Sequence, residues 1–432
     1  MPLKILITGA GIAGTTLAYF LSHQPQSHTI TILERSPTLR ATGLQVDLRG
    51  PGIQVLRAMG LEEEFRAISV PEQGLGLVDG RGWRWGYFPV RKGATGKGGL
   101  QSFTTEWEVM RGDLTRMLYG ESLKGKEGVR YEFGVWVEEV REEEGDEGVE
   151  VVLSDGRRER FDLVIGADGL GSRMRGMMLG GGEDGRVGVH ELGVYAGYFT
   201  VRKEVGDGEG YDATAFIATK GRGIMTRRHE KERYLAYLFC RAEAGELQRG
   251  RKGDVEKEKQ VLTKALRGAG WQTEEILRGM EEADDFYCER MGVVNLDRWS
   301  RGRVVLVGDA AYCPSAMTGM GTSCAMAGAY VLAGEIGRVC GRREATVTKG
   351  DIETALARYE EKLRPFINHV QRGLLDNNDY MGKLPSSAFG IGVMYFLFAV
   401  ASFFRLDVLA RWVLREDTNG WQLPEYPEVV RN

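Results

Sequence analysis

The stretch KILITGAGIAG, residues 4–14, decides the fold of this chain. An apolar strand leads into Gly-x-Gly-x-x-Gly and a helical pattern, and the next apolar strand ends at the acidic Glu34. This order is typical of the βαβ unit that binds a dinucleotide. Gly9 allows the tight turn, Gly11 lets a pyrophosphate approach the backbone, and Gly14 lets the helix lie close to the strand. Glu34 is then expected to accept a hydrogen bond from a ribose hydroxyl.

Length and composition narrow the class of protein. The 432 residues allow two or three domains, and the net charge of -4 gives no basic footprint for nucleic acid. The five cysteines are an odd set without a C-x-x-C motif or zinc-site spacing, which indicates reduced thiols and no structural metal. The chain begins directly with its first strand, without the pattern of a secretory signal. We therefore expect a cytoplasmic protein that binds neither nucleic acid nor a metal.

One apolar segment near the C-terminus allows two interpretations. Residues 388–404 contain no charge over seventeen positions, between Lys383 and Arg405, which is the lower limit for a bilayer span. A helix buried between domains is the favoured interpretation, because the segment is short and contains Gly390 and Gly392. The alternative is a surface that touches a membrane, so peripheral membrane contact stays open.

A second block of small residues follows a run of alternating residues. The alternation over 129–165 predicts a β meander, which ends in Gly-Ala-Asp-Gly at 166–169. Small residues after a buried strand allow close backbone approach, and Asp168 can meet a polar edge of a cofactor. Further upstream, Arg111 stands near the start of a predicted helix, where its charge suits the phosphates or the adenosine side of a nucleotide.

A third block, residues 303–321, again takes a buried strand into a glycine-containing loop. Gly-Asp at 308–309 ends the strand, a loop with Pro314 follows, and Gly319-Met320-Gly321 open a long helix. Asp309 can accept hydrogen bonds from a polyol, and the N–H groups of the helix start can hold an electron-rich ring edge.

Between the second and third blocks the composition changes. From 188 to 292 aromatic residues alternate with others in a pattern typical of antiparallel strands, with a helical pair at about 254–282. A sheet inserted between two cofactor-binding segments is suited to form the wall of a substrate site. Its polar residues Arg227, Arg228 and His229 are expected at the surface rather than in contact with a substrate.

In this order the blocks resemble the class A FAD-dependent flavoprotein monooxygenases, the aromatic hydroxylases related to para-hydroxybenzoate hydroxylase. The resemblance covers roughly residues 1–375 and rests on ordered motifs: Gly9, Gly11 and Gly14 with Glu34; Arg111; Gly166–Gly169; and Gly308-Asp309 through Gly321. Within the group, Gln-Val-Asp-Leu-Arg at 45–49 and the short C-terminus are most similar to the branch of tetracycline-inactivating monooxygenases and related secondary-metabolite enzymes.

The resemblance implies an α/β fold with a Rossmann-like FAD-binding domain, an inserted, mostly antiparallel β-sheet substrate domain and a helical C-terminus. The FAD-binding domain is expected to be discontinuous, over 1–187 and 293–345. The substrate domain is expected at 188–292 and the C-terminal helical region at 346–432, where Pro365 predicts a break between two helices.

The resemblance also implies which residues bind the cofactors. Arg40 would contact NADPH, Asp47, seven residues later, would contact FAD, and Asp309 would bind the ribitol. The set expected to bind FAD is Gly9, Gly11, Ala13, Gly14, Glu34, Arg35, Asp47, Arg111, Asp168, Asp309, Pro314, Gly319, Met320 and Gly321. No protein residue is assigned a catalytic role, because the chemistry of the family is carried by the flavin C4a-hydroperoxide.

The reaction implied is the insertion of one oxygen atom from O2, with FAD bound and NADPH or NADH as co-substrate. No second Gly-x-Gly-x-x-Gly unit follows Glu34, so the reduced nicotinamide is expected to bind only transiently. Hydroxylation of a mid-sized aromatic or polycyclic secondary metabolite is favoured, while Baeyer–Villiger insertion and epoxidation remain open. The only partner expected is this small-molecule substrate, and the chain is expected to be a monomer or a homodimer.

Three other functions are compatible with parts of the sequence. Trp83-Arg84-Trp85 resembles part of the Trp-x-Trp-x-Ile-Pro motif of flavin-dependent halogenases, but it stands before Arg111 rather than in the substrate region. A non-catalytic protein of the Rab escort or GDP-dissociation-inhibitor type would keep the first glycine motif, yet it would be expected to lose the ring-side motif that is intact here. A membrane-associated epoxidase or reductase of a lipid-like substrate would use residues 388–404.

Overall fold

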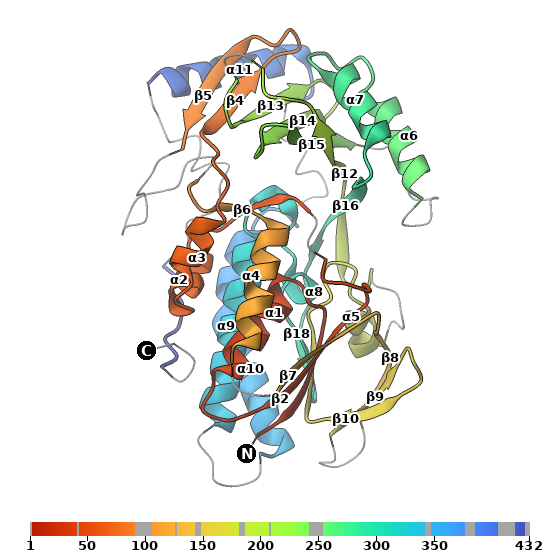
Figure 1. Cartoon of the computed structure of the whole chain (residues 1–432), viewed down its shortest axis with the longest axis vertical. Coiled ribbons are helices and arrows are strands. Elements are labelled where there is room, and N and C mark those ends of the chain that lie inside the picture. Colours follow the sequence, from red (N-terminus) through yellow and green to blue (C-terminus); the bar gives the residue numbers. More distant parts are fainter. Residues whose placement is uncertain are drawn as a thin grey trace.

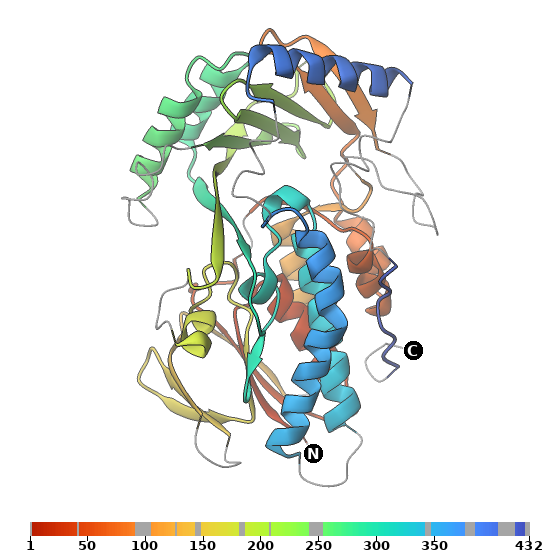
Figure 2. The ribbon, with the colours of Figure 1, turned by 180° about the vertical axis from the view of Figure 1, so that it is seen from behind.

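The computed structural model of the chain describes residues 2–40, 43–90, 105–125, 128–142, 148–180, 186–206, 209–241, 254–341, 347–375, 385–404 and 420–427. Figure 1 shows a unit of sheet and long helices around the N-terminus, and a second sheet at the opposite end of the long axis. The long strands β12 (Val189–Arg202) and β16 (Tyr287–Val294) run from one to the other, as Figure 2 shows from behind.

The first sheet has six strands in the order β17-β18-β11-β1-β2-β7, which are parallel except for β17. They are β1 (Lys4–Thr8), β2 (Thr29–Glu34), β7 (Val129–Phe133), β11 (Leu163–Gly166), β17 (Ser300–Arg301) and β18 (Val304–Leu306). The central strands are buried at nearly every position, because a parallel sheet is covered on both faces.

Four helices pack against one another beside this sheet. They are α1 (Ile12–Ser22), α4 (Arg111–Leu123), α9 (Gly321–Cys340) and α10 (Lys349–Gln371). Helix α10 continues through Pro365, so the predicted break at this residue is wrong. The backbone hydrogen bond that proline cannot make is offset because its neighbours Leu363, Phe366 and Ile367 are buried in the core.

Only the middle of the predicted β meander forms a sheet of its own. It consists of β8 (Val137–Glu142), β9 (Val149–Leu153) and β10 (Arg158–Phe161), in antiparallel order. The two ends of the predicted meander, β7 and β11, join the parallel sheet instead. The sequence of β11 explains this difference, since Leu-Val-Ile-Gly is buried throughout, as a central parallel strand must be.

The second sheet has seven strands in the order β16-β12-β15-β14-β13-β4-β5. Besides β12 and β16 these are β4 (Gly74–Val78), β5 (Arg84–Pro89), β13 (Asp212–Ala218), β14 (Arg222–Arg228) and β15 (Arg233–Arg241). All neighbours pair antiparallel except β4 with β13, and the helices α6 (Val255–Leu266) and α7 (Thr273–Glu282) pack against the sheet. Residues 74–89, counted with the first domain segment in the sequence-based division, belong to this sheet.

Short elements complete the fold, and the predicted α/β class is confirmed. The helices are α2 (Pro51–Ala58), α3 (Glu62–Ala67), α5 (Arg173–Leu179) and α8 (Asp309–Tyr312), with a 3-10 turn at Ala316–Thr318. The strands β3 (Gln45–Asp47) and β6 (Glu108–Met110) form a small antiparallel pair. This pair lies between the two large sheets, next to the start of α4.

Helix α11 (Ala388–Phe403) lies across the far end of the molecule, on β5 and β13 of the second sheet (Figure 2). The favoured interpretation of this segment, a helix buried between domains, is therefore wrong. In the part of the chain that the structure describes, no helix is both long enough and apolar enough to cross a membrane.

Candidate functional site

The three glycine-containing blocks meet at one edge of the parallel sheet. Strands β18, β11, β1 and β2 are adjacent and parallel, so their carboxyl ends lie side by side. A Cβ added to Gly9 would lie 2.5 Å from the carbonyl oxygen of Ala167, and one added to Gly308 would lie 2.9 Å from the Cβ of Ala13. Segments far apart in the sequence are thus in direct contact, at the position where open α/β sheets bind their ligands.

In the first glycine loop, two glycines are required for close packing and the third leaves space for a ligand. Gly9 has a φ of +101°, and a Cβ added to Gly14 would lie 2.0 Å from the oxygen of Gly9, so both positions require glycine. A Cβ added to Gly11 would meet no atom of the described residues within 4 Å. Gly11 is also the N-cap of α1. No side chain of the described residues accepts a hydrogen bond from the first N–H groups of this helix. The first N–H groups of α1 are therefore available to an anion such as a pyrophosphate.

Glu34 lies against this loop. Its carboxylate accepts hydrogen bonds from the N–H of Ala10 at 3.1 Å and from the N–H of Ser36 at 2.9 Å. These bonds fix the carboxylate beside the N-terminus of α1, where a ribose of a bound dinucleotide would lie. The adjacent Arg35 is exposed.

A second open helix start lies at α9. Met320, its N-cap, is fully buried, and Gly319 before it has a φ of +66°. Within the described ranges no side chain caps this helix, and a Cβ added to Gly321 would meet nothing within 4 Å. Pro314 is buried in the preceding loop. The N–H groups of α9 and its dipole therefore point at open space, as is needed to hold an electron-rich ring edge.

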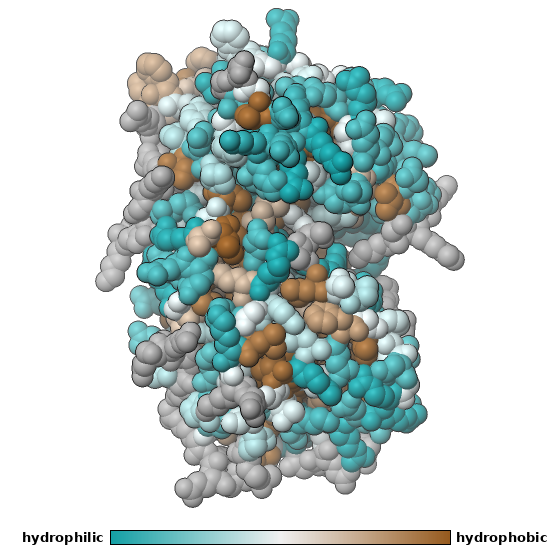
Figure 3. Space-filling model, in the orientation of Figure 1, coloured by the Kyte–Doolittle hydropathy of each residue, from teal (hydrophilic) through white to brown (hydrophobic). Residues whose placement is uncertain are grey.

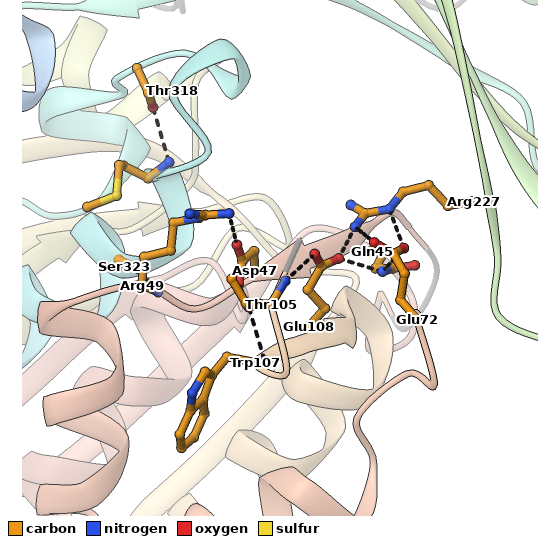
Figure 4. A network of polar contacts seen from close by, with 11 residues as sticks. Gln45, Asp47, Arg49, Glu72, Thr105, Trp107, Glu108, Arg227, Thr318 and Ser323 are labelled. Carbon is orange, nitrogen blue, oxygen red and sulfur yellow. Dashed lines mark hydrogen bonds and ion pairs between the residues drawn. The ribbon is translucent and has the colours of Figure 1, made fainter. Parts of the chain in front are cut away.

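A buried ion pair connects β3 with the start of α9 (Figure 4). Asp47 lies 2.5 Å from Arg49 and accepts a hydrogen bond from the hydroxyl of Thr105 at 2.6 Å. The backbone N–H of Arg49 donates to the hydroxyl of Ser323 in α9 at 2.9 Å, and its side chain is only 3% exposed. Arg49 is missing from the residues chosen from the sequence. Its place two positions after Asp47, just beyond the end of the short strand, was the available signal.

Arg111 and Asp309 lie near each other across the site. Arg111 opens α4, and its N–H donates to the carbonyl of Leu44 at 2.8 Å. Burial raises the pKa of Asp309, and the positive charge of Arg111 opposes this effect. The two residues, separated by almost two hundred positions in the chain, therefore belong to one electrostatic environment.

Asp168 has partners within the protein. Its carboxylate accepts hydrogen bonds from the hydroxyl of Ser172 at 2.5 Å and from the N–H groups of Arg173 at 2.8 Å and Met174 at 3.1 Å. These bonds stabilise the start of α5. The observed geometry gives Asp168 this structural function, and contact with a cofactor stays a prediction.

Arg40 is exposed and belongs to the same side of the site as Arg111. Burial raises the pKa of Tyr287 above its ordinary value and Glu289 adds to the effect, while the charges of Arg111 and Arg40 oppose it. Tyr287 lies in β16, so Arg40 is within electrostatic range of a strand that runs between the two sheets. The next residues, 41 and 42, lie outside the described ranges.

An apolar, aromatic surface of the second sheet faces the cofactor side. Tyr198 packs against Tyr237 and Tyr287, with ring centroids 5.4 and 4.9 Å apart. The cluster also includes Leu44, which directly precedes β3, and Met317 from the loop before α9. Part of the predicted aromatic wall thus lies on the side of the loop before α9. The other aromatic residues of the sheet pack in the core with α6 and α7; they are Tyr195, Phe199, Phe216 and Tyr234.

Next to this surface is a polar group that we call the interlayer cluster: Gln45, Glu72, Glu108 and Arg227 (Figure 4). Arg227 donates to Glu72 at 2.8 and 2.9 Å and is paired with Glu108. The amide of Gln45 donates to Glu72 at 2.8 Å and to Glu108 at 2.5 Å. The expected surface position of Arg227 and its neighbour Arg228 is wrong, because both are buried.

The interlayer cluster places two carboxylates against one guanidinium. Burial raises the pKa of Glu108 to about 8, although Arg227 lowers it, and the nearby charge of Glu72 raises it further. Burial and the neighbouring carboxylate thus favour the protonated form of Glu108. A single proton and a single cation then balance the two carboxylates in a region without access to water.

A pocket of about 400 Å³ opens between the layers on the side of α4. Four of its charged lining residues form two ion pairs, Asp113 with Arg116 and Glu230 with Arg233, and the carboxylate of Asp285 accepts hydrogen bonds from Thr200. Because these charges are already neutralised, the pocket lacks the excess positive charge that a phosphate group needs, and we assign it no cofactor.

Comparison with known proteins identifies the class. The family described as "FAD binding domain" matches residues 2–372. The chain is 42% identical to the FAD-dependent monooxygenase asL4 of Sarocladium schorii over 436 residues, covering 99% of each chain. It is 41% identical to the flavin-dependent monooxygenase eupH of Phoma sp over 404 residues, covering 90% of this chain and 89% of eupH. The crystal structure of tetracycline destructase Tet(51) has a TM-score of 0.72 at 27% identity, covering 99% of this chain and 100% of that chain.

The chain therefore belongs to the FAD-binding-domain family of flavoproteins. It is an FAD-dependent monooxygenase, as the resemblance in its sequence implied. The residues present fit this cofactor, because an extended dinucleotide has phosphates for the open start of α1 and a ring system for the open start of α9.

The two glycines of the first loop provide a matched pair of variants. Gly11→Ala should leave the stability of the FAD-free protein almost unchanged and weaken FAD binding at least about tenfold, because its Cβ would occupy the space of the ligand. Gly14→Ala should lower the free energy of unfolding of the FAD-free protein by about 1–3 kcal/mol, because its Cβ meets backbone. Flavin fluorescence titration and thermal unfolding measure the two effects. Wild-type FAD affinity in Gly11→Ala would contradict the assignment.

Glu108 should make stability depend on pH. The unfolded chain releases this proton at the ordinary pKa of 4.5 and the folded chain at a raised pKa of about 8. The free energy of unfolding therefore falls as pH rises through this interval. Glu108→Gln should flatten the decline of the unfolding temperature, measured by circular dichroism at several pH values in the interval. Glu64→Gln, at an exposed position of α3, is the control and should keep the wild-type slope. An unchanged slope in Glu108→Gln would refute the role of this proton.

Proposed function

We propose that this enzyme uses NAD(P)H and O2 to insert one oxygen atom into a mid-sized aromatic or polycyclic secondary metabolite, most often as a hydroxyl group. The balanced reaction consumes substrate, O2, NAD(P)H and a proton, and gives hydroxylated substrate, water and NAD(P)+. The observation that carries the proposal is the open helix start at Gly321 opposite the aromatic surface around Tyr198. Bound FAD supplies the activated oxygen in this reaction.

The residues of this chain have the task of holding the cofactor and keeping water out. The N-terminus of α1 and Glu34 would hold the ADP half, and Asp309 with Arg111 would face the ribitol and the flavin phosphate. The start of α9 would hold the ring edge. The buried pair of Asp47 and Arg49 ties β3 to α9, so that this ring position is fixed from both sides.

The apolar surface of the second sheet supports an aromatic substrate. Tyr198 and Tyr237 are only 2 and 4% exposed, so the partly buried rings of Tyr287 and Phe239 beside them would be the ones to stack on a substrate. The hydroxyl of Tyr237 accepts a hydrogen bond from the N–H of Gln45, and burial raises its pKa to about 12, so it stays neutral. The likeness to a tetracycline destructase supports a polycyclic substrate class.

The halogenase alternative receives no support from the position of its motif. Trp83 is 72% exposed in the turn between β4 and β5, and the indole of Trp85 donates to Asp79 in the same turn. Neither indole belongs to the aromatic cluster that faces the cofactor side.

A variant of Arg40 tests where the reduced nicotinamide cofactor binds. It is exposed near Tyr287, and an arginine can pair with the phosphates of NADPH. Arg40→Ala should raise the KM for NADPH about tenfold, because about one charge-assisted contact is lost. The FAD content should change little. The exposed Arg141→Ala is the matched control and should behave like the wild type. An unaltered KM in Arg40→Ala would remove this residue from the site.

The reaction itself is tested with the FAD-loaded protein and a panel of phenolic and polycyclic compounds. Oxidation of NADPH and of NADH is followed by absorbance, and products are analysed by mass spectrometry under 18O2. The proposal predicts substrate-stimulated oxidation and a product with one added 18O atom. Products that carry oxygen from water, or chlorinated products in the presence of chloride, would contradict it.

A further inference from the structure

The outward face of α11 is apolar along its whole length. The helix has no charged residue, and its inward side chains Ile391, Tyr395 and Ala401 are buried against the second sheet. The outward side chains are Phe389, Val393, Phe396, Leu397, Phe403 and Phe404, which are 83, 44, 60, 52, 81 and 63% exposed. Figure 3 shows brown, apolar side chains at the upper left, where one end of α11 lies.

This face follows the helical period. Positions 389, 393, 396, 397, 403 and 404 are spaced by three, four or seven residues and so form one stripe. Surface helices of water-soluble domains normally turn polar residues to this side. A contiguous stripe with four phenylalanines marks a surface that another apolar phase or partner covers.

Three exposed basic residues lie beside the stripe, together with one carboxylate, that of Asp79 in the β4–β5 turn. Lys220 is exposed, and its N–H donates to the carbonyl of Ser386 just before α11 begins. Arg81 and Arg84 are exposed in the adjoining β4–β5 hairpin, next to the exposed Trp83. Figures 1 and 2 both show this hairpin and α11 at the same end of the molecule.

We propose that the outer face of α11 inserts into the headgroup region of an anionic lipid bilayer. A helix that lies in this region buries aromatic and aliphatic side chains on one side, and basic residues around it attract anionic lipids. Trp83 would lie at the polar boundary, where tryptophan is enriched. The helix would lie in the surface without crossing it, and it would hold the second sheet against the membrane.

The charges favour a membrane over a second copy of the chain. A twofold symmetric dimer through α11 would bring the same surface patch of both copies together. Lys220, Arg81 and Arg84 of one copy would then approach like charges of the other, which is unfavourable. An anionic lipid surface instead complements them.

The test is vesicle flotation of the full-length, FAD-loaded protein. Vesicles of phosphatidylcholine with phosphatidylserine should carry the wild type upward, and vesicles of phosphatidylcholine alone, or high salt, should carry less. The variant Phe389→Ser/Phe396→Ser/Phe403→Ser should lower the partition at least about tenfold, because it removes three apolar side chains from the lipid contact. Its FAD content and circular dichroism should equal those of the wild type, since these side chains face outward.

A matched control replaces another exposed apolar residue. Leu123, at the end of α4, is 47% exposed and far from α11, and Leu123→Ser should float like the wild type. The proposal is overturned if the wild type stays with the soluble fraction, or if the triple variant floats equally well. It is also overturned if sedimentation velocity shows a dimer that the triple variant dissociates while no form of the protein binds vesicles.

Discussion

The close backbone contact at the carboxyl edge of the parallel sheet is the constraint on which the rest of the structure depends. Gly14 lies against Gly9, and Gly9 lies against Ala167, with no room for a Cβ at either glycine. These contacts bring the ends of β1 and β11 together. Because α1 starts at this point with open N–H groups, the same contacts that close the core also create an anion site.

The second sheet is held over the carboxyl edge of the parallel sheet by two contacts, one polar and one apolar. The interlayer cluster links Arg227 of β14 to Glu72 and Glu108, and the aromatic cluster packs beside it. Both carboxylates are buried, so removal of Arg227 would leave the charge of Glu72 uncompensated. This arrangement fixes the distance between the aromatic surface and the start of α9, and it therefore defines the space in which a substrate would meet the flavin.

The sequence predicted the features that arise from local patterns. Gly9, Gly11 and Gly14 could be assigned because each glycine acts within its own turn or helix start, and the structure gives each the geometry expected of it. The burial of Arg227 could not be recognised, because it depends on partners from distant segments. Arg49 was overlooked although its ion-pair partner Asp47 stands only two positions before it. Pro365 predicted a break that tertiary packing overrides, and an apolar segment such as 388–404 does not tell whether both of its faces are covered.

Hydrogen exchange of the protein with and without FAD tests the central claim most directly. The first N–H groups of α1 and of α9 lack side-chain caps within the described residues, so they should exchange fast in the FAD-free protein. The account predicts that FAD slows exchange at both helix starts, in peptides that cover 10–15 and 320–325. Protection at only one of them, or at neither, would contradict a cofactor that extends from Gly11 to Gly321.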